Sequence, residues 1–163
     1  MYRALLIMQL GIPYSLFNSY FILFGKRSKN TIVEHSNFVN VLYSSMIGTF
    51  NNITLVFSLQ DYSVGEYFNK YKCDFTPNTH NVGVLKHLVQ IEHSILDRFR
   101  HHSSSKPSYT IKEHSLLNNR IKLHSVASKC SQENVVSGDF VLKISGLWET
   151  EHEYGLIYKF YAL

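Results

Sequence analysis

The chain has 163 residues, of which 45% are hydrophobic, 14% aromatic and 17% charged. This composition excludes a disordered chain, and the length suits one domain whose core needs neither disulfide bonds nor a structural metal. The formal net charge is +4, and the excess is local, because residues 66–130 carry ten Lys or Arg, five Asp or Glu, and seven of the nine His. A basic middle fits a polyanionic partner, and ordinary solubility is the competing interpretation.

Residues 4–24, ALLIMQLGIPYSLFNSYFILF, are mostly apolar, and three basic residues follow at 26, 27 and 29. The segment is long enough to cross a bilayer or to belong to a signal peptide, but Pro13 and several polar side chains interrupt it. A core element and a non-native extension are further interpretations. We therefore separate a hydrophobic N-terminal segment, residues 1–30, from a single β-rich domain, residues 31–163.

Three strands are predicted next, over residues 36–46, 52–60 and 65–75. In the second, Ile53, Leu55, Phe57 and Leu59 alternate with polar residues, which is typical of a half-buried strand. In the third, aromatic residues and Cys73 share one face, and Phe68, Lys70 and Lys72 share the other.

One main helix is predicted over residues 82–100, because apolar residues recur there at three- and four-residue steps. Pro107 and a run of serines end it and form a loop over 101–108. Residues 109–126 then predict a hairpin or a bent strand pair with a turn at Asn118-Asn119. Residues 139–163 predict a closing hairpin whose turn lies in the sequence ETEHE.

The order of strands, helix and strands predicts an α+β fold in which β structure dominates. The expected architecture is an antiparallel sheet, or an OB-like barrel with one main helix. In the closing hairpin, parity places Phe140, Leu142, Ile144 and Trp148 on the core face, and Lys143, Lys159 and Tyr161 outside.

Cationic side chains alternate with apolar ones along the predicted middle hairpin, where Lys112, His114, Arg120, Lys122 and His124 project from one side. Proteins that bind single strands usually stack the bases on aromatic rings and hold the nucleic-acid backbone with Lys and Arg. An ordinary solvated sheet face is the competing interpretation. The predicted nucleic-acid-binding residues are Lys112, Arg120, Lys122, Lys143, Lys159, Tyr161, Phe68, Lys70 and Lys72.

No motif of a known catalytic class is present: the sequence lacks H-E-x-x-H, G-x-S-x-G, a P-loop and G-x-G-x-x-G. The two cysteines, Cys73 and Cys130, do not form a C-x-x-C pair, and no spacing matches a standard metal site. We therefore expect no enzymatic activity, no cofactor and no metal. The sequence leaves the redox state of the two thiols open.

The final segment, FVLKISGLWETEHEYGLIYKFYAL (residues 140–163), resembles the ends of small proteins from large DNA viruses and virus-derived mobile elements. Some of these are OB-type single-stranded DNA-binding proteins. The resemblance implies that Trp148 and Tyr154 matter to the hairpin, and it carries over no catalytic residue.

The expected function is thus non-catalytic binding of nucleic acid, single-stranded DNA foremost, in the nucleus or a viral replication compartment. The alternative is a structural or protein-interaction module, which could self-associate or contact a membrane through residues 4–24. Membrane and secreted locations stay open.

Overall fold

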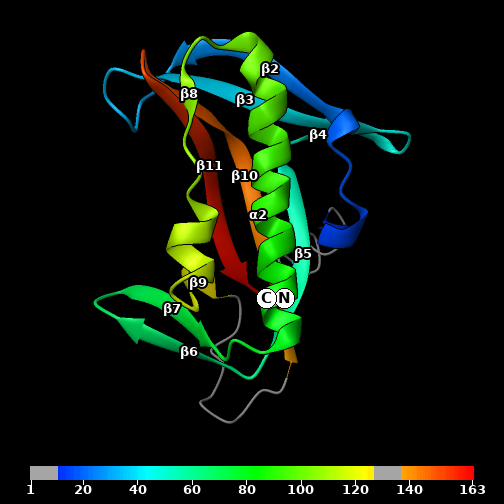
Figure 1. The fold of residues 1–163 in the computed structure, drawn as a ribbon, viewed down its shortest axis with the longest axis vertical. Coiled ribbons are helices and arrows are strands. Elements are labelled where there is room, and N and C mark those ends of the chain that lie inside the picture. Colours follow the sequence, from blue (N-terminus) through cyan, green and yellow to red (C-terminus); the bar gives the residue numbers. More distant parts are fainter. Residues whose placement is uncertain (1–10, 127–136) are drawn as a thin grey trace.

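The computed structural model describes residues 11–126 and 137–163. Strands dominate, and one long helix, α2 (Thr79–Phe99), lies across one face of the sheet (Figure 1). The predicted β-dominated α+β class is therefore confirmed. The strands are β1 (Ile12–Pro13), β2 (Ile22–Lys29), β3 (Asn37–Ser45), β4 (Gly48–Asn51), β5 (Ile53–Gln60), β6 (Tyr62–Tyr67), β7 (Lys70–Phe75), β8 (Lys106–Pro107), β9 (Arg120–Val126), β10 (Ser137–Glu149) and β11 (Glu153–Ala162). Short helical turns are η1 (Tyr14–Leu16), η2 (Ser19–Phe21), η3 (Arg100–His102) and the π-helical turn η4 (Lys112–Leu116).

Strand β10 forms the centre of the sheet. It pairs with β11 along one side, and with β5 and then β3 along the other. Beyond β11 the sheet continues through β9, β7 and β6, while β2 and β4 both join β3. The pairs β1–β5, β8–β11 and β9–β11 are parallel and the others antiparallel, so the sheet is mixed. It is not closed, and the OB-like barrel is therefore not what the described residues form.

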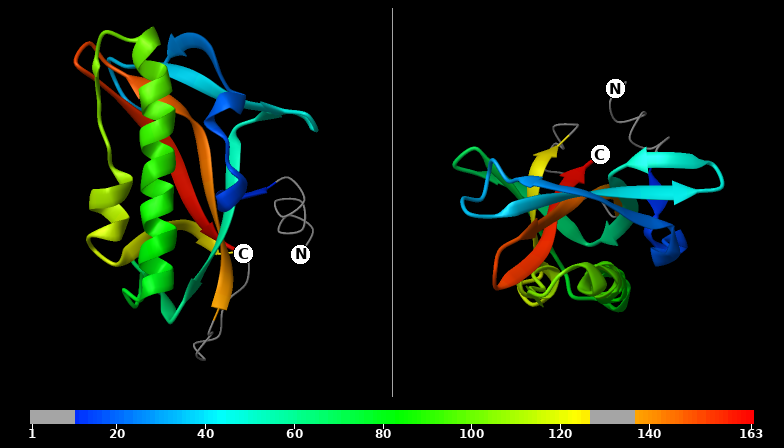
Figure 2. Two further views of the ribbon diagram at one scale, coloured as in Figure 1. Left: turned by 45° about the vertical axis from the view of Figure 1, so that its right-hand side comes forward. Right: turned by 90° about the horizontal axis from the view of Figure 1, so that it is seen from above.

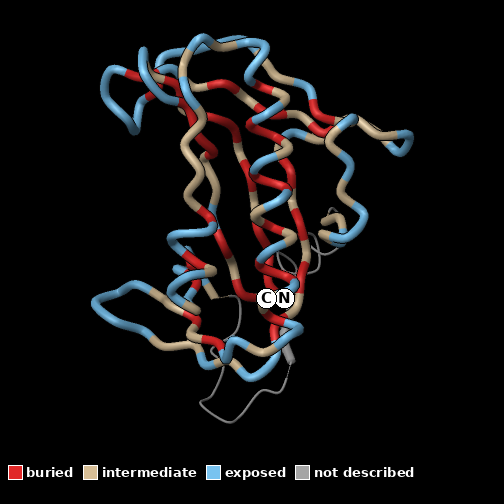
Figure 3. The backbone as a smooth tube through the Cα atoms, in the orientation of Figure 1, coloured by how far each residue is buried: buried red, intermediate tan, exposed pale blue. Residues whose placement is uncertain are grey.

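Helix α2 lies against one face of the sheet (Figure 2), and buried residues recur along its length (Figure 3). The helix predicted from residue 82 begins three residues earlier, because the Asn78 side chain accepts a hydrogen bond from the Asn81 backbone N–H at 2.8 Å and caps it. Asn81 is itself buried and bonds to both backbone groups of Gln60. The apolar positions expected from the periodicity are all buried: Val84, Leu85, Leu88, Ile91, Ile95, Leu96 and Phe99.

The N-terminal part of the described chain belongs to the same sheet. Strand β2 pairs antiparallel with β3, and Ile22 is buried in the common core. The Arg27 guanidinium also reaches the Glu149 carboxylate of β10, with an Nε to Oε2 distance of 2.6 Å. Residues 22–29 therefore contribute a strand to the same sheet as the residues that follow position 30.

The apolar segment over residues 4–24 does not form an α-helix where it is described, since residues 12–24 contain β1, the short helical turns η1 and η2, and the start of β2. Residues 4–10 lie outside the described residues. In the part of the chain that the structure describes, no helix is both long enough and apolar enough to cross a membrane.

The strand predicted over 65–75 is in fact a tight hairpin. Strands β6 and β7 pair antiparallel, and the turn between them is Phe68-Asn69, whose φ angles are 47° and 58°. Positive φ at both central residues is the geometry of the turns that favour hairpins, and Asn69 tolerates it well. The alternation seen in the sequence thus continues across a turn, and Phe68 does not share a strand face with Lys70 and Lys72.

The hairpin predicted over 109–126 is half wrong. Residues 112–116 form the π-helical turn η4, and only the second half, β9, is a strand. The predicted turn at Asn118-Asn119 lies between them, with Asn119 at a φ of 48°. Lys112 and His114 consequently project from a helical turn and not from a strand beside Arg120 and Lys122.

A bulge in β10 changes the predicted faces of the closing hairpin. The register with β11 shifts between Ile144 and Gly146, so the parity beyond this point is reversed. Phe140, Leu142 and Ile144 are buried as expected. Leu147 is buried in place of Trp148, which is only partly covered and packs its indole over Gly155. The prediction that Trp148 belongs to the core is therefore wrong.

Candidate nucleic-acid interface

A pocket of about 500 Å³ opens beside β11, between η4 and β9. Its volume lies in the range of sites that hold small ligands. Its lining contains cationic, aromatic, hydroxyl and aliphatic side chains and no carboxylate. The lining residues are Thr110, His114, Ser115, Lys122, Leu123, His124, Trp148, Leu156, Ile157, Tyr158, Lys159 and Phe160.

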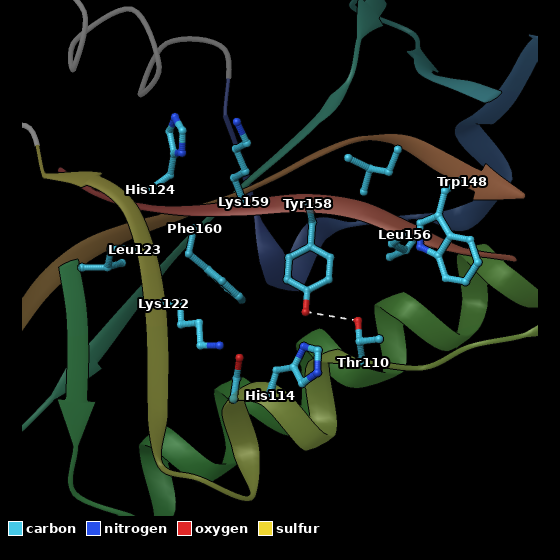
Figure 4. A pocket seen from close by; sticks show the side chains of 12 residues that line it. Thr110, His114, Lys122, Leu123, His124, Trp148, Leu156, Tyr158, Lys159 and Phe160 are labelled. Atoms are coloured by element: carbon cyan, nitrogen blue, oxygen red, sulfur yellow. Dashed lines mark hydrogen bonds between the residues drawn. The ribbon is translucent and has the colours of Figure 1, made fainter. Parts of the chain in front are cut away.

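Figure 4 shows how these side chains lie. Lys122 points from β9 toward the space in front of Tyr158 and His114, whereas His124 and Lys159 project on the other side of β11. Trp148 lies at the far end, beyond Leu156. The cationic groups therefore flank the pocket on both sides of β11, and an anionic ligand at the edge of this strand would meet positive charge from both.

The buried carboxylate of Glu92 on α2 holds the start of η4 in place. It accepts hydrogen bonds from the backbone N–H of Thr110 at 2.9 Å and of Ile111 at 3.1 Å. Thr110 Oγ1 in turn lies 3.2 Å from the Tyr158 hydroxyl inside the pocket (Figure 4). Burial raises the pKa of the Glu92 carboxyl, while the hydrogen bonds from Thr110 and Ile111 act in the opposite direction. Glu92 thus fixes the wall of the pocket that carries Thr110 and His114.

The strand register places predicted lysines directly opposite one another. Lys143 on β10 faces Lys159 on β11, and Lys72 on β7 faces Lys122 on β9. Like charges at directly opposed positions are unfavourable in an antiparallel pair. Among the described residues, no carboxylate lies within ion-pair distance of Lys122, Lys143 or Lys159. An external anion would relieve this repulsion.

Other predicted cations are partly neutralised or stand apart. Arg120 Nε lies 2.5 Å from the Asp74 carboxylate, and Lys72 Nζ lies 3.6 Å from the same group. Lys112 is exposed on η4, and Lys70 follows the β6–β7 turn. The structure therefore brings Lys122 and Lys159 to the pocket, places Lys72 and Lys143 next to them in register, and pairs Arg120 with a carboxylate.

The two predicted stacking residues have different surroundings. The half-buried Tyr161 ring meets His124 edge to face, with centroids 5.3 Å apart. Burial raises the pKa of the Tyr161 hydroxyl. Phe68 is 80% exposed at the tip of the β6–β7 hairpin, and its ring meets Tyr67 with centroids 4.4 Å apart. Phe68 is thus the better presented of the two rings.

Phe68→Asn is expected to raise the free energy of unfolding by about 0.5–1 kcal/mol, because a bulky residue at positive φ is strained and Asn is not. If the ring stacks on a base, the same change weakens binding of oligo-dT by about 5-fold or more. Chemical denaturation and fluorescence anisotropy measure the two effects. Ile32→Asn, at another exposed apolar residue, is the matched control for binding. A more stable variant with unchanged affinity would show that Phe68 does not contact the nucleic acid.

The sequence did not point to several residues of the pocket. Thr110 and Tyr158 carry no pattern of their own, and Trp148 was assigned to the core. Glu92 follows the buried Ile91 on the helix. Its position next to the apolar stripe was the one feature of the sequence that pointed to a buried carboxylate. His114 and His124 were expected beside the lysines, and both line the pocket.

Neither a metal centre nor a reactive thiol emerges from the described residues. No group of three or more His, Cys, Asp or Glu side chains is placed there to hold a metal ion. Cys73 is buried and free, and burial raises its pKa to about 12, so it remains a thiol at neutral pH. Cys130 lies outside the described residues.

Comparison of the whole chain with protein-family models, with curated proteins and with solved structures finds no match.

Proposed function

We propose that this chain binds single-stranded nucleic acid, DNA foremost, without catalysing a reaction on it. The observation that carries the proposal is the lining of the pocket beside β11, in which two lysines and two histidines accompany aromatic rings and no carboxylate. Positive side chains next to rings are what single strands need, because the cations hold phosphates and the rings stack bases. The opposed lysines Lys143 and Lys159, neither of which has a carboxylate within ion-pair distance among the described residues, supply unbalanced positive charge next to the same pocket.

The predicted residues have unequal roles in this interface. Lys122, Lys159 and Lys143 contact phosphates, with Lys70, Lys72 and Lys112 at the periphery. Arg120 contributes less than its charge suggests, because Asp74 already pairs with it. Tyr161 on β11 and Phe68 at the turn between β6 and β7 offer rings for stacking. The resemblance of residues 140–163 leads us to propose further that the protein is of a viral or mobile-element type and acts in the nucleus or in a viral replication compartment.

The test is fluorescence anisotropy of labelled oligo-dT with the full chain at several salt concentrations. The double variant Lys122→Ala/Lys159→Ala is expected to bind about 10-fold more weakly or worse. If the two lysines contact two phosphates, the slope of log affinity against log salt falls by about 1.4. Loss of both positive charges from the pocket is the physical reason.

Lys29→Ala/Lys86→Ala provides the matched control, since it removes two exposed lysines on β2 and α2, away from the pocket. It is expected to change affinity less than threefold. Equal weakening by both double variants would mean that net charge alone matters and would refute the site. Absence of binding by the unaltered chain at low salt would refute the function.

A second candidate function is a protein-interaction module. The turn between β3 and β4 exposes Met46 completely and Ile47 by 89%, in a stretch from 36 to 60 that has no charged side chain. Such an uncharged apolar tip favours contact with another protein over contact with a polyanion. Salt separates the two candidates, because phosphate binding falls steeply as salt rises and an apolar contact does not.

A further inference from the structure

The edge of β11 is incomplete in its middle. The strand pairs with β8 at Glu153 and Tyr154, and with β9 from Phe160 onward. Within the described chain, residues 155–159 have no strand partner on this side. The pocket lies at this gap, because its lining includes Leu156 to Phe160 from β11 and residues 122–124 from β9.

The alternation of the strand shows which backbone groups of β11 point into the gap, where no described strand pairs with them. The Tyr154 carbonyl accepts a hydrogen bond from the Ser108 backbone N–H at 2.7 Å, on the β8 side of the strand. Because peptide groups alternate in direction along a strand, those of Leu156 and Tyr158 point to the same side. Leu156 is only 5% exposed. Backbone groups in such a place need a hydrogen-bond partner from outside the sheet.

We propose that this gap receives one base of the bound single strand, with its polar edge on the backbone of Leu156 and Tyr158 and its phosphates near Lys122 and Lys159. The inference rests on the proposed function and deepens it by assigning a base-reading subsite. The chemistry is complementary, because a base presents donors and acceptors in one plane, as an unpaired strand edge does. Bound phosphates find lysines on both sides of β11 (Figure 4).

A base fits the gap better than an added peptide strand. The gap is bounded by β8 at one end and by β9 at the other, so only about five residues of β11, roughly 16 Å, are free. An extended peptide would have to turn out of the sheet at both ends. A single base enters from the open side and needs no such turns.

The only Trp of the chain, Trp148, lines the pocket and reports its occupancy. The experiment uses the full chain and two probes of equal length, oligo-dT and an abasic oligomer with the same phosphates. Oligo-dT is expected to quench Trp148 emission at saturation, and the abasic oligomer is expected to bind without quenching. Oligo-dT should also bind more tightly, by at least the roughly 10-fold that one base–aromatic contact contributes.

Two variants make the assignment specific. His114→Ala removes an exposed side chain of the pocket wall and is expected to lower the preference for oligo-dT over the abasic oligomer by about 3-fold or more, with abasic binding nearly unchanged. His101→Ala, at an exposed histidine of η3 outside the pocket, is the matched control and should leave the preference unchanged.

The outcomes separate this inference from the proposed function. If both probes bind and neither quenches Trp148, the base subsite is refuted while single-strand binding stands. If neither probe binds, the function itself fails. If an acidic extended peptide quenches Trp148 and oligo-dT does not, the gap is a strand-addition site for protein, and the inference is overturned.

Discussion

Replacing the buried Glu92 by alanine is expected to lower the free energy of unfolding by about 3 kcal/mol, because two backbone N–H groups, one of them buried, lose their acceptor. These groups belong to Thr110 and Ile111, and both oxygens of the carboxylate are engaged. Urea denaturation measures the change. Glu113→Ala, at an exposed carboxylate on η4, is the matched control and should cost under about 0.5 kcal/mol.

The same variant gives a pH dependence of definite sign. Burial raises the pKa of Glu92 in the folded state above its value in the unfolded chain. Its contribution is therefore fully present below the unfolded pKa and is lost as the pH rises through the folded pKa. The difference in stability between the unaltered chain and Glu92→Ala should be largest near pH 4 and should narrow toward pH 7. A difference that widens over this range would contradict the assignment.

A methyl group at Gly146 is expected to cost about 3 kcal/mol of stability. A Cβ built there would lie 2.4 Å from the Val39 carbonyl oxygen and 2.6 Å from the Phe38 ring. Since one of these atoms is backbone of the paired strand β3, the sheet itself would have to shift. Thermal or chemical denaturation of Gly146→Ala measures this loss.

Gly83→Ala is the opposite case and serves as its control. Gly83 is exposed within α2, and apart from its chain neighbours and the backbone of the helix itself no atom lies within 4 Å of a Cβ at this position. Alanine is the better helix former, so this variant should be more stable by about 0.5–1 kcal/mol. If Gly83→Ala raises the free energy of unfolding and Gly146→Ala lowers it, the close approach of β3 to the β10 bulge is the cause of the loss at Gly146. A neutral Gly146→Ala would show that β3 and β10 adjust freely.

Several elements were predictable because their pattern is local. The apolar spacing of α2 and the alternation of Ile53, Leu55, Phe57 and Leu59 are written within single segments, and the structure buries all of these side chains. The closing hairpin was predictable for the same reason. Where an element has one face on the core, its periodicity predicts correctly which side chains are buried.

The predictions from the sequence are wrong where a single residue or a distant contact changes the local geometry. One extra residue in β10 reverses the parity of the strand, which moves Trp148 out of the core and Leu147 into it. The turn at Phe68-Asn69 interrupts an alternation that runs on without a break in the sequence. Residues 112–116 alternate as a strand would, but Glu92 on a distant helix holds the start of this segment in a helical turn.

By itself the sequence determined a β-dominated chain with one amphipathic helix, a basic middle and no catalytic motif, because composition and periodicity are properties of neighbouring residues. The tertiary structure alone decided which cations meet. Strand register brought Lys143 to Lys159 and Lys72 to Lys122, and it paired Arg120 with Asp74. It also left the edge of β11 open beside Lys122 and Tyr158. Register and strand order depend on contacts between distant segments, and no local pattern encodes them.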